Sequence, residues 1–186
     1  MKKITRYIDI DGVVIDTEAG LFDEYNRRKS MGENIKRLVY LQNLNWQEWI
    51  RQASIINDSI NIIKEHDPSS MTFLTRIHSL NEGTAKIEYF REQGIKNSII
   101  LVPHTLSKSS VVEAKQSLLV DDSIKNLDDW STHDGIPLFF NAEGTNQSTF
   151  KEQTILNENY PVISSLESVF SEETEEYCKR LTLKRK

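Results

Sequence analysis

The feature that most constrains the fold is a series of short apolar runs that alternate with helical patterns after residue 70. Runs of this length, bounded by turn-forming residues, are typical of buried strands. With a first strand near the N-terminus, we expect strands at residues 4–10, 71–75, 98–102, 117–120, 136–140 and 161–163. We expect helices from Asn81, as the N-cap, to about Gln93, and also at 108–115 and 171–186. This alternation predicts an α/β fold with a doubly wound parallel sheet.

A helical block interrupts the alternation after the first strand. Between residues 17 and 65 there is little glycine and no proline, and apolar residues recur at helical spacing, as at Leu38, Leu41 and Leu44. The segment Asp67-Pro68 then breaks the pattern. We therefore expect an α/β core domain of residues 1–16 and 69–186, with a small helical cap of residues 17–68 inserted after the first strand.

Composition narrows the class of protein. Of the 186 residues, 38% are hydrophobic and 27% are charged, which fits a globular chain, and the net charge of −5 argues against binding to a nucleic acid polymer. The single cysteine fits a reducing compartment, and we find neither a secretory signal nor an apolar stretch of about 20 residues that could span a membrane. We expect a cytoplasmic protein without a membrane partner, and leave monomer and homodimer open.

The ends of two predicted strands carry paired carboxylates. Asp9 and Asp11 follow the first apolar run, and Asp121 and Asp122 end the run at 117–120. Ligands of doubly wound sheets lie outside the carboxyl ends of the strands, so we expect the two pairs to meet. Their mutual repulsion would be relieved by a divalent cation, and Mg²⁺ prefers oxygen ligands of this kind.

Carboxylates in such a site can also perform chemistry. An aspartate can attack phosphorus as a covalent nucleophile and form an aspartyl-phosphate. A carboxyl two residues further on can protonate the leaving oxygen and then deprotonate water. Gly12, directly after Asp11, lets the backbone turn and approach the site closely.

These residues form four motifs that resemble those of haloacid dehalogenase (HAD) superfamily phosphatases. The stretch DIDGVV, residues 9–14, is similar to the first motif, in which Asp-X-Asp-Gly precedes Thr or Val. The run MTFLT ends in Thr75, SKSSVV supplies Lys108, and LLVDD supplies Asp121 and Asp122. The four motifs occur in the family's order and cover most of the chain outside residues 17–70.

The resemblance implies a role for each motif residue. Asp9 would be the nucleophile and Asp11 the general acid and base. Thr75 would donate a hydrogen bond to a phosphoryl oxygen, and Lys108 would neutralise charge on the phosphate and on Asp9. Lys115 is the rival to Lys108, although we expect it on the far face of its short helix.

The same resemblance implies a magnesium cofactor and its ligands. Asp122 would bind the ion directly, together with the Asp9 carboxylate and the backbone carbonyl of Asp11. Asp121 would act through a water molecule or hold Lys108. The opposite division between Asp121 and Asp122 stays open.

The segments LLVDDSIKNLDDW, GIPLFFN and YPVISSLESV are similar to the bacterial and mitochondrial 5'-deoxyribonucleotidase branch. In that branch the cap usually lends aromatic side chains to a nucleotide base, and Phe22, Trp46 and Trp49 are the candidates here. Two tryptophans three residues apart on a helix more often pack in the core or the cap. Arg76 either reaches a phosphate or pairs with a cap acid.

The functional hypothesis is a magnesium-dependent phosphatase acting on a small phosphorylated substrate, a (deoxy)nucleoside monophosphate in the first instance. A sugar phosphate or another small phosphate is the alternative substrate. A non-catalytic relative that binds a phosphorylated ligand is the alternative class. The four histidines show no metal-ligand spacing and are expected to have no role in the site: His66, His78, His104 and His133.

Overall fold

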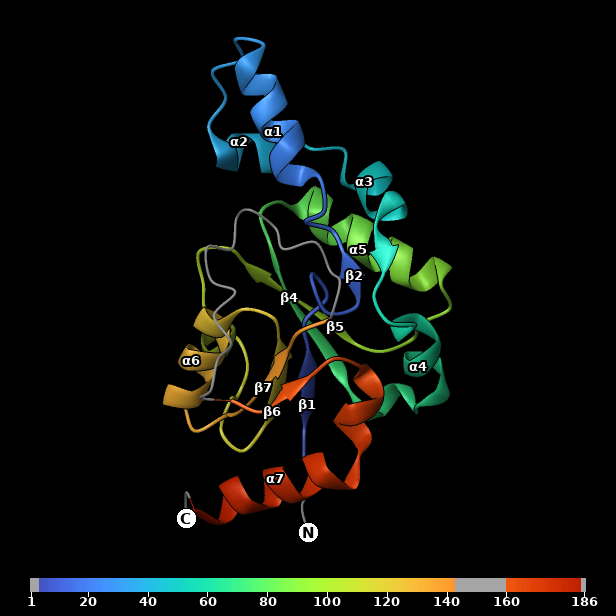
Figure 1. Cartoon of the computed structure of the whole chain (residues 1–186), viewed down its shortest axis with the longest axis vertical. Coiled ribbons are helices and arrows are strands. Elements are labelled where there is room, and N and C mark those ends of the chain that lie inside the picture. The colour runs from blue at the N-terminus through green and yellow to red at the C-terminus, as the bar shows by residue number, and fades with distance from the viewer. Residues whose placement is uncertain (1–3, 143–159, 185–186) are drawn as a thin grey trace.

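We obtained a computed structural model of the chain, in which residues 4–142 and 160–184 are described. A parallel sheet of six strands forms its centre (Figure 1), with the order β5-β4-β1-β6-β7-β8. The strands are β1 (Arg6–Ile8), β4 (Thr72–Ile77), β5 (Ile99–Pro103), β6 (Leu118–Asp121), β7 (Ile136–Phe140) and β8 (Val162–Ile163). Every neighbouring pair is parallel, which confirms the predicted α/β fold.

Burial explains why these runs form strands. All four residues of β6 are buried, and β4 is buried at Phe73, Leu74 and Thr75 in succession. Continuous apolar strands of this kind belong to sheets that are covered on both faces. The helices α5 (Leu80–Glu92) and α4 (Ser59–Glu65) lie on one side of the sheet in Figure 1, and α6 (Ile124–Thr132) lies on the other. The last helix, α7 (Glu172–Lys184), crosses the end of the molecule near both termini.

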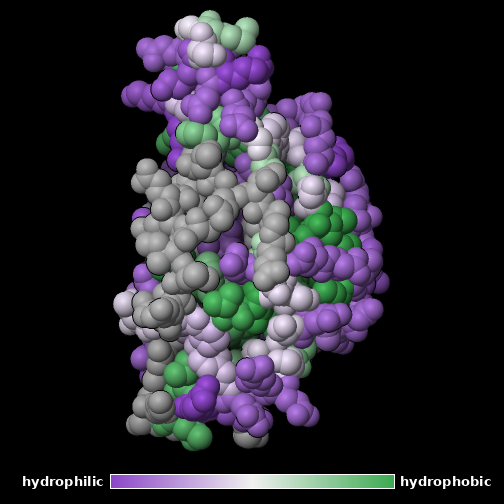
Figure 2. Space-filling view, viewed as in Figure 1, coloured by the Kyte–Doolittle hydropathy of each residue, from purple (hydrophilic) through white to green (hydrophobic). Residues whose placement is uncertain are grey.

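Three further helices lie beyond the carboxyl ends of the strands: α1 (Leu21–Ser30), α2 (Arg37–Gln42) and α3 (Trp46–Gln52). Figure 1 shows α1 and α2 at the end of the molecule farthest from the termini. The surface of this end is mostly hydrophilic in Figure 2. Within the described residues, no helix is both long and apolar enough to cross a lipid bilayer.

The sequence predicted only helices between residues 17 and 65. The structure differs, because the strand β3 also lies in this range. A second, two-stranded antiparallel sheet lies where the chain passes between the core and α1–α3, and its strands are β2 (Ile15–Asp16) and β3 (Ser54–Ile55). Each strand has only two residues, too few to show an alternating pattern. The pairing of β2 with β3 brings together the two ends of the segment that contains α1, α2 and α3.

The helix α3 is anchored to the core helix α5. Arg51 pairs with Glu92 across 2.7 Å between Nη2 and Oε1, and Gln47 donates to Glu88 across 2.7 Å. Asn81 also donates from Nδ2 to the carbonyl of Leu44. The base of the inserted segment is therefore held against the core by polar contacts.

Some predicted boundaries were wrong. The N-cap of α5 is Ser79, whose hydroxyl accepts from the backbone N–H of Glu82, so the helix begins before the predicted cap at Asn81. Residues 108–115 contain only a single 3-10 turn at Lys108–Ser110. The helix α6 was not predicted, and two further 3-10 turns occupy Pro68–Ser70 and Leu166–Phe170.

Candidate active site

The candidate site begins where β1 ends. The backbone N–H of Asp9 still donates to Val120 of β6, and the chain then turns sharply, so that Gly12 donates to Ile15. Gly12 has a φ of 73°, and a Cβ atom there would lie 1.9 Å from the Asp122 carboxylate. Glycine at this position therefore lets the first carboxylate motif approach the loop after β6.

A buried lysine joins the two acidic strand ends. The ammonium of Lys108 lies 3.0 Å from Asp9 Oδ1 and 2.6 Å from Asp121 Oδ2. Asp121 is fully buried, and it also accepts from Ser123 N–H at 2.8 Å and from the Asn126 amide. Lys115, the predicted rival, is exposed. The structure thus brings Lys108 to the two aspartates.

Asp9 carries a carboxyl with a strongly shifted pKa. Its pKa is raised from 3.8 to about 8, chiefly by burial, which disfavours the ionised form. Lys108 opposes this rise, and Asp121, Asp11 and Asp122 add to it through repulsion. Negative charge at Asp9 therefore requires additional positive charge beyond that of Lys108.

Three carboxylates are placed where a cation could supply that charge. Each of these residues offers one carboxylate oxygen, and the three oxygens, from Asp9, Asp121 and Asp122, lie within 4.8 Å of one another. Oxygen donors at such spacing suit Mg²⁺. Asp121 is already engaged by Lys108 and by backbone N–H, whereas Asp122 lines the adjoining cavity. The residues present therefore fit a magnesium ion.

The second aspartate of the motif lies in a different set of contacts. Asp11 Oδ1 accepts from the Thr17 hydroxyl at 2.6 Å, and Asp11 Oδ2 accepts from the Thr75 hydroxyl at 3.0 Å. Asp11 Oδ2 also accepts from the ammonium of Lys86 at 2.5 Å. Both Thr17 and Thr75 are buried. Thr17 and Lys86 were not predicted as site residues.

These contacts oppose the effect of burial on Asp11. Burial alone would raise the pKa of its carboxyl, but Lys86, Thr17 and Thr75 together hold that pKa below its ordinary value. The converse holds for Lys86, where burial would lower the pKa and the carboxylates of Asp11 and Glu82 raise it. The two motif aspartates thus have opposite electrostatic environments, although they are two residues apart.

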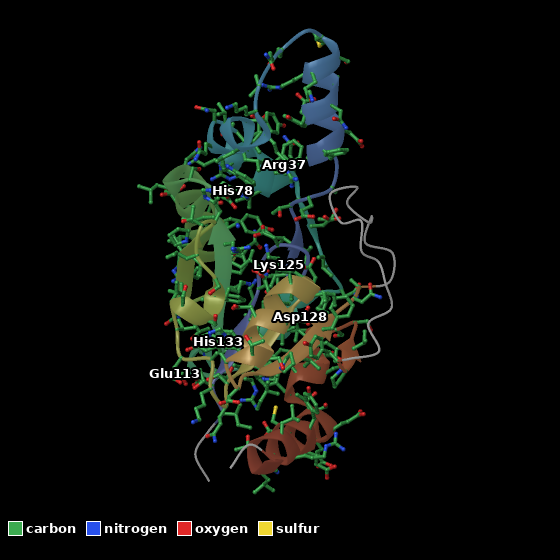
Figure 3. The ribbon with its side chains drawn as sticks, turned by 90° about the vertical axis from the view of Figure 1, so that its left-hand side faces the viewer. Arg37, His78, Glu113, Lys125, Asp128 and His133 are labelled. Carbon is green, nitrogen blue, oxygen red and sulfur yellow. The ribbon has the colours of Figure 1, made fainter. Side chains whose placement is uncertain are left out.

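A cavity of about 330 Å³ opens above these side chains. Its walls come from the sheet edge and from the inserted helices, and Figure 3 labels Arg37 of α2 and His78, which follows β4, on these two sides. The lining comprises Asp9, Asp11, Thr17, Glu18, Leu21, Arg37, Leu41, Trp46, Arg76, His78, Glu82, His104, Asp122, Ser123 and Asn126. His78 and His104, to which the sequence had assigned no role, therefore face the site.

The candidate substrate-binding residues do not all line the same cavity. Trp46 and Arg76 line the cavity of the aspartates, whereas Trp49 lines a larger cavity of about 870 Å³ among α1, α2 and α3. Phe22, in α1, lines neither of these two cavities. The indole N–H groups of Trp46 and Trp49 donate to the carbonyls of Leu41 and Thr17.

Arg76 pairs with backbone rather than with a cap acid. Its Nη2 donates to the carbonyls of His104 and Leu106, at 3.1 and 2.8 Å. Its Nε is buried and has no hydrogen-bond partner among the described residues. The guanidinium is therefore held in place by uncharged acceptors beside the cavity, where it can attract an anion.

Comparison with solved structures identifies the fold. The chain is similar to a HAD hydrolase of family IA from Entamoeba histolytica, with a TM-score of 0.59, 15% identity, and 95% and 99% of the two chains covered. It is also similar to a phosphonoacetaldehyde hydrolase-like protein from Oleispira antarctica, with a TM-score of 0.58, 12% identity, and 97% and 94% covered. The structural neighbours are thus HAD-superfamily hydrolases, and the chain shares their fold.

A third similar structure was determined with a metal. It is a HAD hydrolase from Bacillus subtilis bound to magnesium, with a TM-score of 0.54, 13% identity, and 91% and 98% covered. No protein-family model matches the sequence, and no curated protein matches it. Identities of 10–15% establish the common fold, while the chemistry has to be argued from the site itself.

Proposed function

We propose that this protein is a magnesium-dependent phosphomonoesterase that works through an aspartyl-phosphate at Asp9. The observation that carries the proposal is the position of Asp9 between Lys108 and the carboxylates of Asp121 and Asp122, at the floor of a cavity. The Asp9 carboxylate thus contacts the Lys108 ammonium on one side, and on the other side it faces a cavity that can hold a substrate. The four motifs that the sequence shares with HAD phosphatases add to this support.

The chemistry follows from the placement of the side chains. An oxygen of Asp9 attacks phosphorus, and the bond from phosphorus to the leaving oxygen breaks. The contacts of Asp11 lower its pKa, so it must first take up a proton, which a monoanionic phosphate ester can supply, before it protonates the leaving oxygen. Asp11 then accepts a proton from the water that attacks phosphorus, and the bond between phosphorus and the Asp9 oxygen breaks to release phosphate. Lys108 stabilises the negative charge on the transferring group. The Thr75 hydroxyl donates to Asp11 in the structure, and it would turn to donate to a phosphoryl oxygen when the substrate binds.

Asp9, Asp122 and the carbonyl of Asp11 would hold the magnesium ion, and Asp121 would support it from behind. The ion would neutralise charge on the phosphate and on the crowded carboxylates. Asp121 fits the supporting role because its oxygens already accept from Lys108, Ser123 and Asn126. Its hydrogen bond to Lys108 also fixes the lysine beside Asp9.

The inserted segment, residues 17–68, is proposed as the cap that selects the substrate. Leu21, Arg37, Leu41 and Trp46 from this segment face the cavity across from the aspartates. A (deoxy)nucleoside monophosphate is the proposed substrate, because an indole beside a phosphate site can contact a base. The bonding of both indole N–H groups to backbone carbonyls instead favours packing, and it supports a smaller substrate such as a sugar phosphate.

Turnover of p-nitrophenyl phosphate, with and without magnesium, tests the proposal. We expect turnover that depends on the metal. Absence of turnover on this ester and on a panel of phosphate monoesters would favour a non-catalytic protein that binds a phosphorylated ligand. Phosphate release from the same panel would rank nucleotides against sugar phosphates.

A further inference from the structure

Lys86 is a buried lysine that none of the four motifs contains. It lies in α5, and its side chain is completely excluded from solvent. Its Nζ lies 2.5 Å from Asp11 Oδ2, 2.7 Å from Glu82 Oε1, 3.0 Å from the carbonyl of Arg76 and 3.1 Å from Thr75 Oγ1. A lysine has three N–H donors, so these four acceptors use all of its hydrogen-bonding capacity.

An ammonium in this position needs compensating charge. Burying a charge without partners is very costly, and here two carboxylates, those of Asp11 and Glu82, contact the same ammonium. Glu82 is held in turn, since its Oε2 accepts from the backbone N–H of His78 at 2.7 Å. Lys86 is therefore fixed by its own helix and by the loop after β4.

The contact with Thr75 determines where the threonine proton points. Lys86 donates to Thr75 Oγ1, so that the hydroxyl proton must be directed elsewhere. The nearer acceptor is Asp11 Oδ2 at 3.0 Å, compared with 3.4 Å for the carbonyl of Arg76. Lys86 thus directs the Thr75 hydroxyl toward Asp11 while it contacts the same carboxylate oxygen itself.

We propose that Lys86 is a positioning residue for the phosphoryl-transfer reaction, which holds the Asp11 carboxylate in the orientation from which it exchanges a proton with the leaving group and with water. The proposal rests on the proposed function. Three donors from three elements converge on this carboxylate: Thr17 after β2, Thr75 in β4 and Lys86 in α5. Of the three, Lys86 alone brings a charge, and it contributes through Asp11 without lining the cavity itself.

The test compares wild type with Lys86→Met/Glu82→Gln. Methionine replaces the buried stem with an uncharged chain of similar length, and glutamine removes the carboxylate that would otherwise be left unpaired. Lys96→Met, which changes an exposed lysine just after α5, serves as the matched control. Thermal melts establish that each variant is folded before kinetics are measured.

The informative substrates are phenyl phosphate and p-nitrophenyl phosphate, which have similar shapes and differ in how much the leaving oxygen needs a proton. Loss of a positioned general acid should lower kcat/KM for phenyl phosphate at least about tenfold more than kcat/KM for p-nitrophenyl phosphate, because kcat/KM covers only the steps up to departure of the leaving group. A merely structural role would lower both kcat/KM values equally. Equal losses, or no loss on either ester, would overturn the proposal.

Crystal structures of the wild type and the double variant give a readout that does not depend on activity. We expect Asp11 to leave its single orientation in the variant, while Asp9 and Asp121 stay in place. An unchanged Asp11 carboxylate would refute the positioning role. Absence of magnesium-dependent turnover in the wild type would refute the proposed function instead, and the two crystal structures would still decide what Lys86 does to Asp11.

Discussion

At the scale of single residues, the two aspartates of the first motif occupy contrasting environments. Asp9 is crowded by other carboxylates and has a raised pKa, whereas Asp11 is surrounded by donors and has a lowered one. In the proposed reaction Asp9 must attack as an anion, so the crowded position is the one that a cation would stabilise. Asp11 has its orientation fixed instead by Thr17, Thr75 and Lys86.

Replacement of the nucleophile is the most direct test at this scale. Asp9→Asn keeps the size of the side chain but removes its ability to attack phosphorus, so we expect kcat to fall by several decades on p-nitrophenyl phosphate. The fold should be retained, because the amide removes a repulsive charge. A variant with more than about a tenth of the wild-type kcat would show that Asp9 is not the nucleophile.

The two aspartates after β6 should differ in their response to magnesium. Asp122→Ala should raise the magnesium concentration needed for half-maximal activity more than Asp121→Ala does, because Asp122 lines the cavity. Asp121→Ala should mainly lower the melting temperature, since Lys108 would lose a fully buried partner. Magnesium titrations of activity decide the ranking, and the reverse order would exchange the two roles.

Sequence reasoning identified the residues that belong to recognisable motifs and missed those defined only by tertiary packing. Lys108 follows a strand in a motif, and the structure places it beside Asp9. Lys86 lies in a helix whose hydrophobic pattern does not show that this lysine is buried. Among many lysines with the same helix propensity, only the three-dimensional position of α5 distinguishes it. Its one local signal is Glu82, four residues earlier in the helix.

At the scale of elements, the strands were the easiest to predict. Their apolar runs are continuous because the sheet is covered on both faces. The two-stranded sheet of β2 and β3 was missed because two-residue strands show no alternating pattern. The helix α6 was missed because its surface is polar and only Leu127 and Trp130 are buried. The two tryptophans of α3 illustrate a similar ambiguity, because helical spacing did not show which one faces the site.

The two tryptophans should therefore behave differently on substitution. Trp46→Ala should raise KM for a nucleoside monophosphate by roughly tenfold or more if the indole contacts the base, since such stacking contributes about 1–3 kcal/mol. Trp49→Ala should leave this KM within about twofold, because Trp49 lines the other cavity. Values of kcat/KM on p-nitrophenyl phosphate control for damage to the cap. Similar KM values for all three proteins would favour a substrate without a base.

At the scale of the whole molecule, the inserted helices are not uniformly attached to the core. The helix α3 is tied to α5 by Arg51–Glu92 and Gln47–Glu88, whereas α1 and α2 extend beyond the sheet (Figure 1). Any closure over the site would therefore be easier for α1 and α2 than for α3. Sequence alone could not reveal this difference, because it depends on contacts between segments about 40 residues apart.

Stability should depend on pH and magnesium together. Folding raises the pKa of Asp9 from 3.8 to about 8. Between these two pH values the folded protein therefore binds a proton that the unfolded chain does not, and the free energy of unfolding falls as pH rises toward 8. Magnesium requires the ionised carboxylate and competes with that proton. The increase in melting temperature on adding magnesium should be larger near pH 9 than near pH 6. Asp9→Asn should reduce this difference, and equal increments in the wild type at both values would contradict the assignment.

The central position of β1 also affects how the chain is made. This strand is synthesised before its partners, because β4 and β6 begin only at Thr72 and Leu118. A nascent chain therefore cannot pair β1 on both sides until β6 has also left the ribosome, and pairings between such distant segments form slowly. The candidate site needs residues from β1, β4 and β6. It would thus be assembled only after the inserted helices have already emerged.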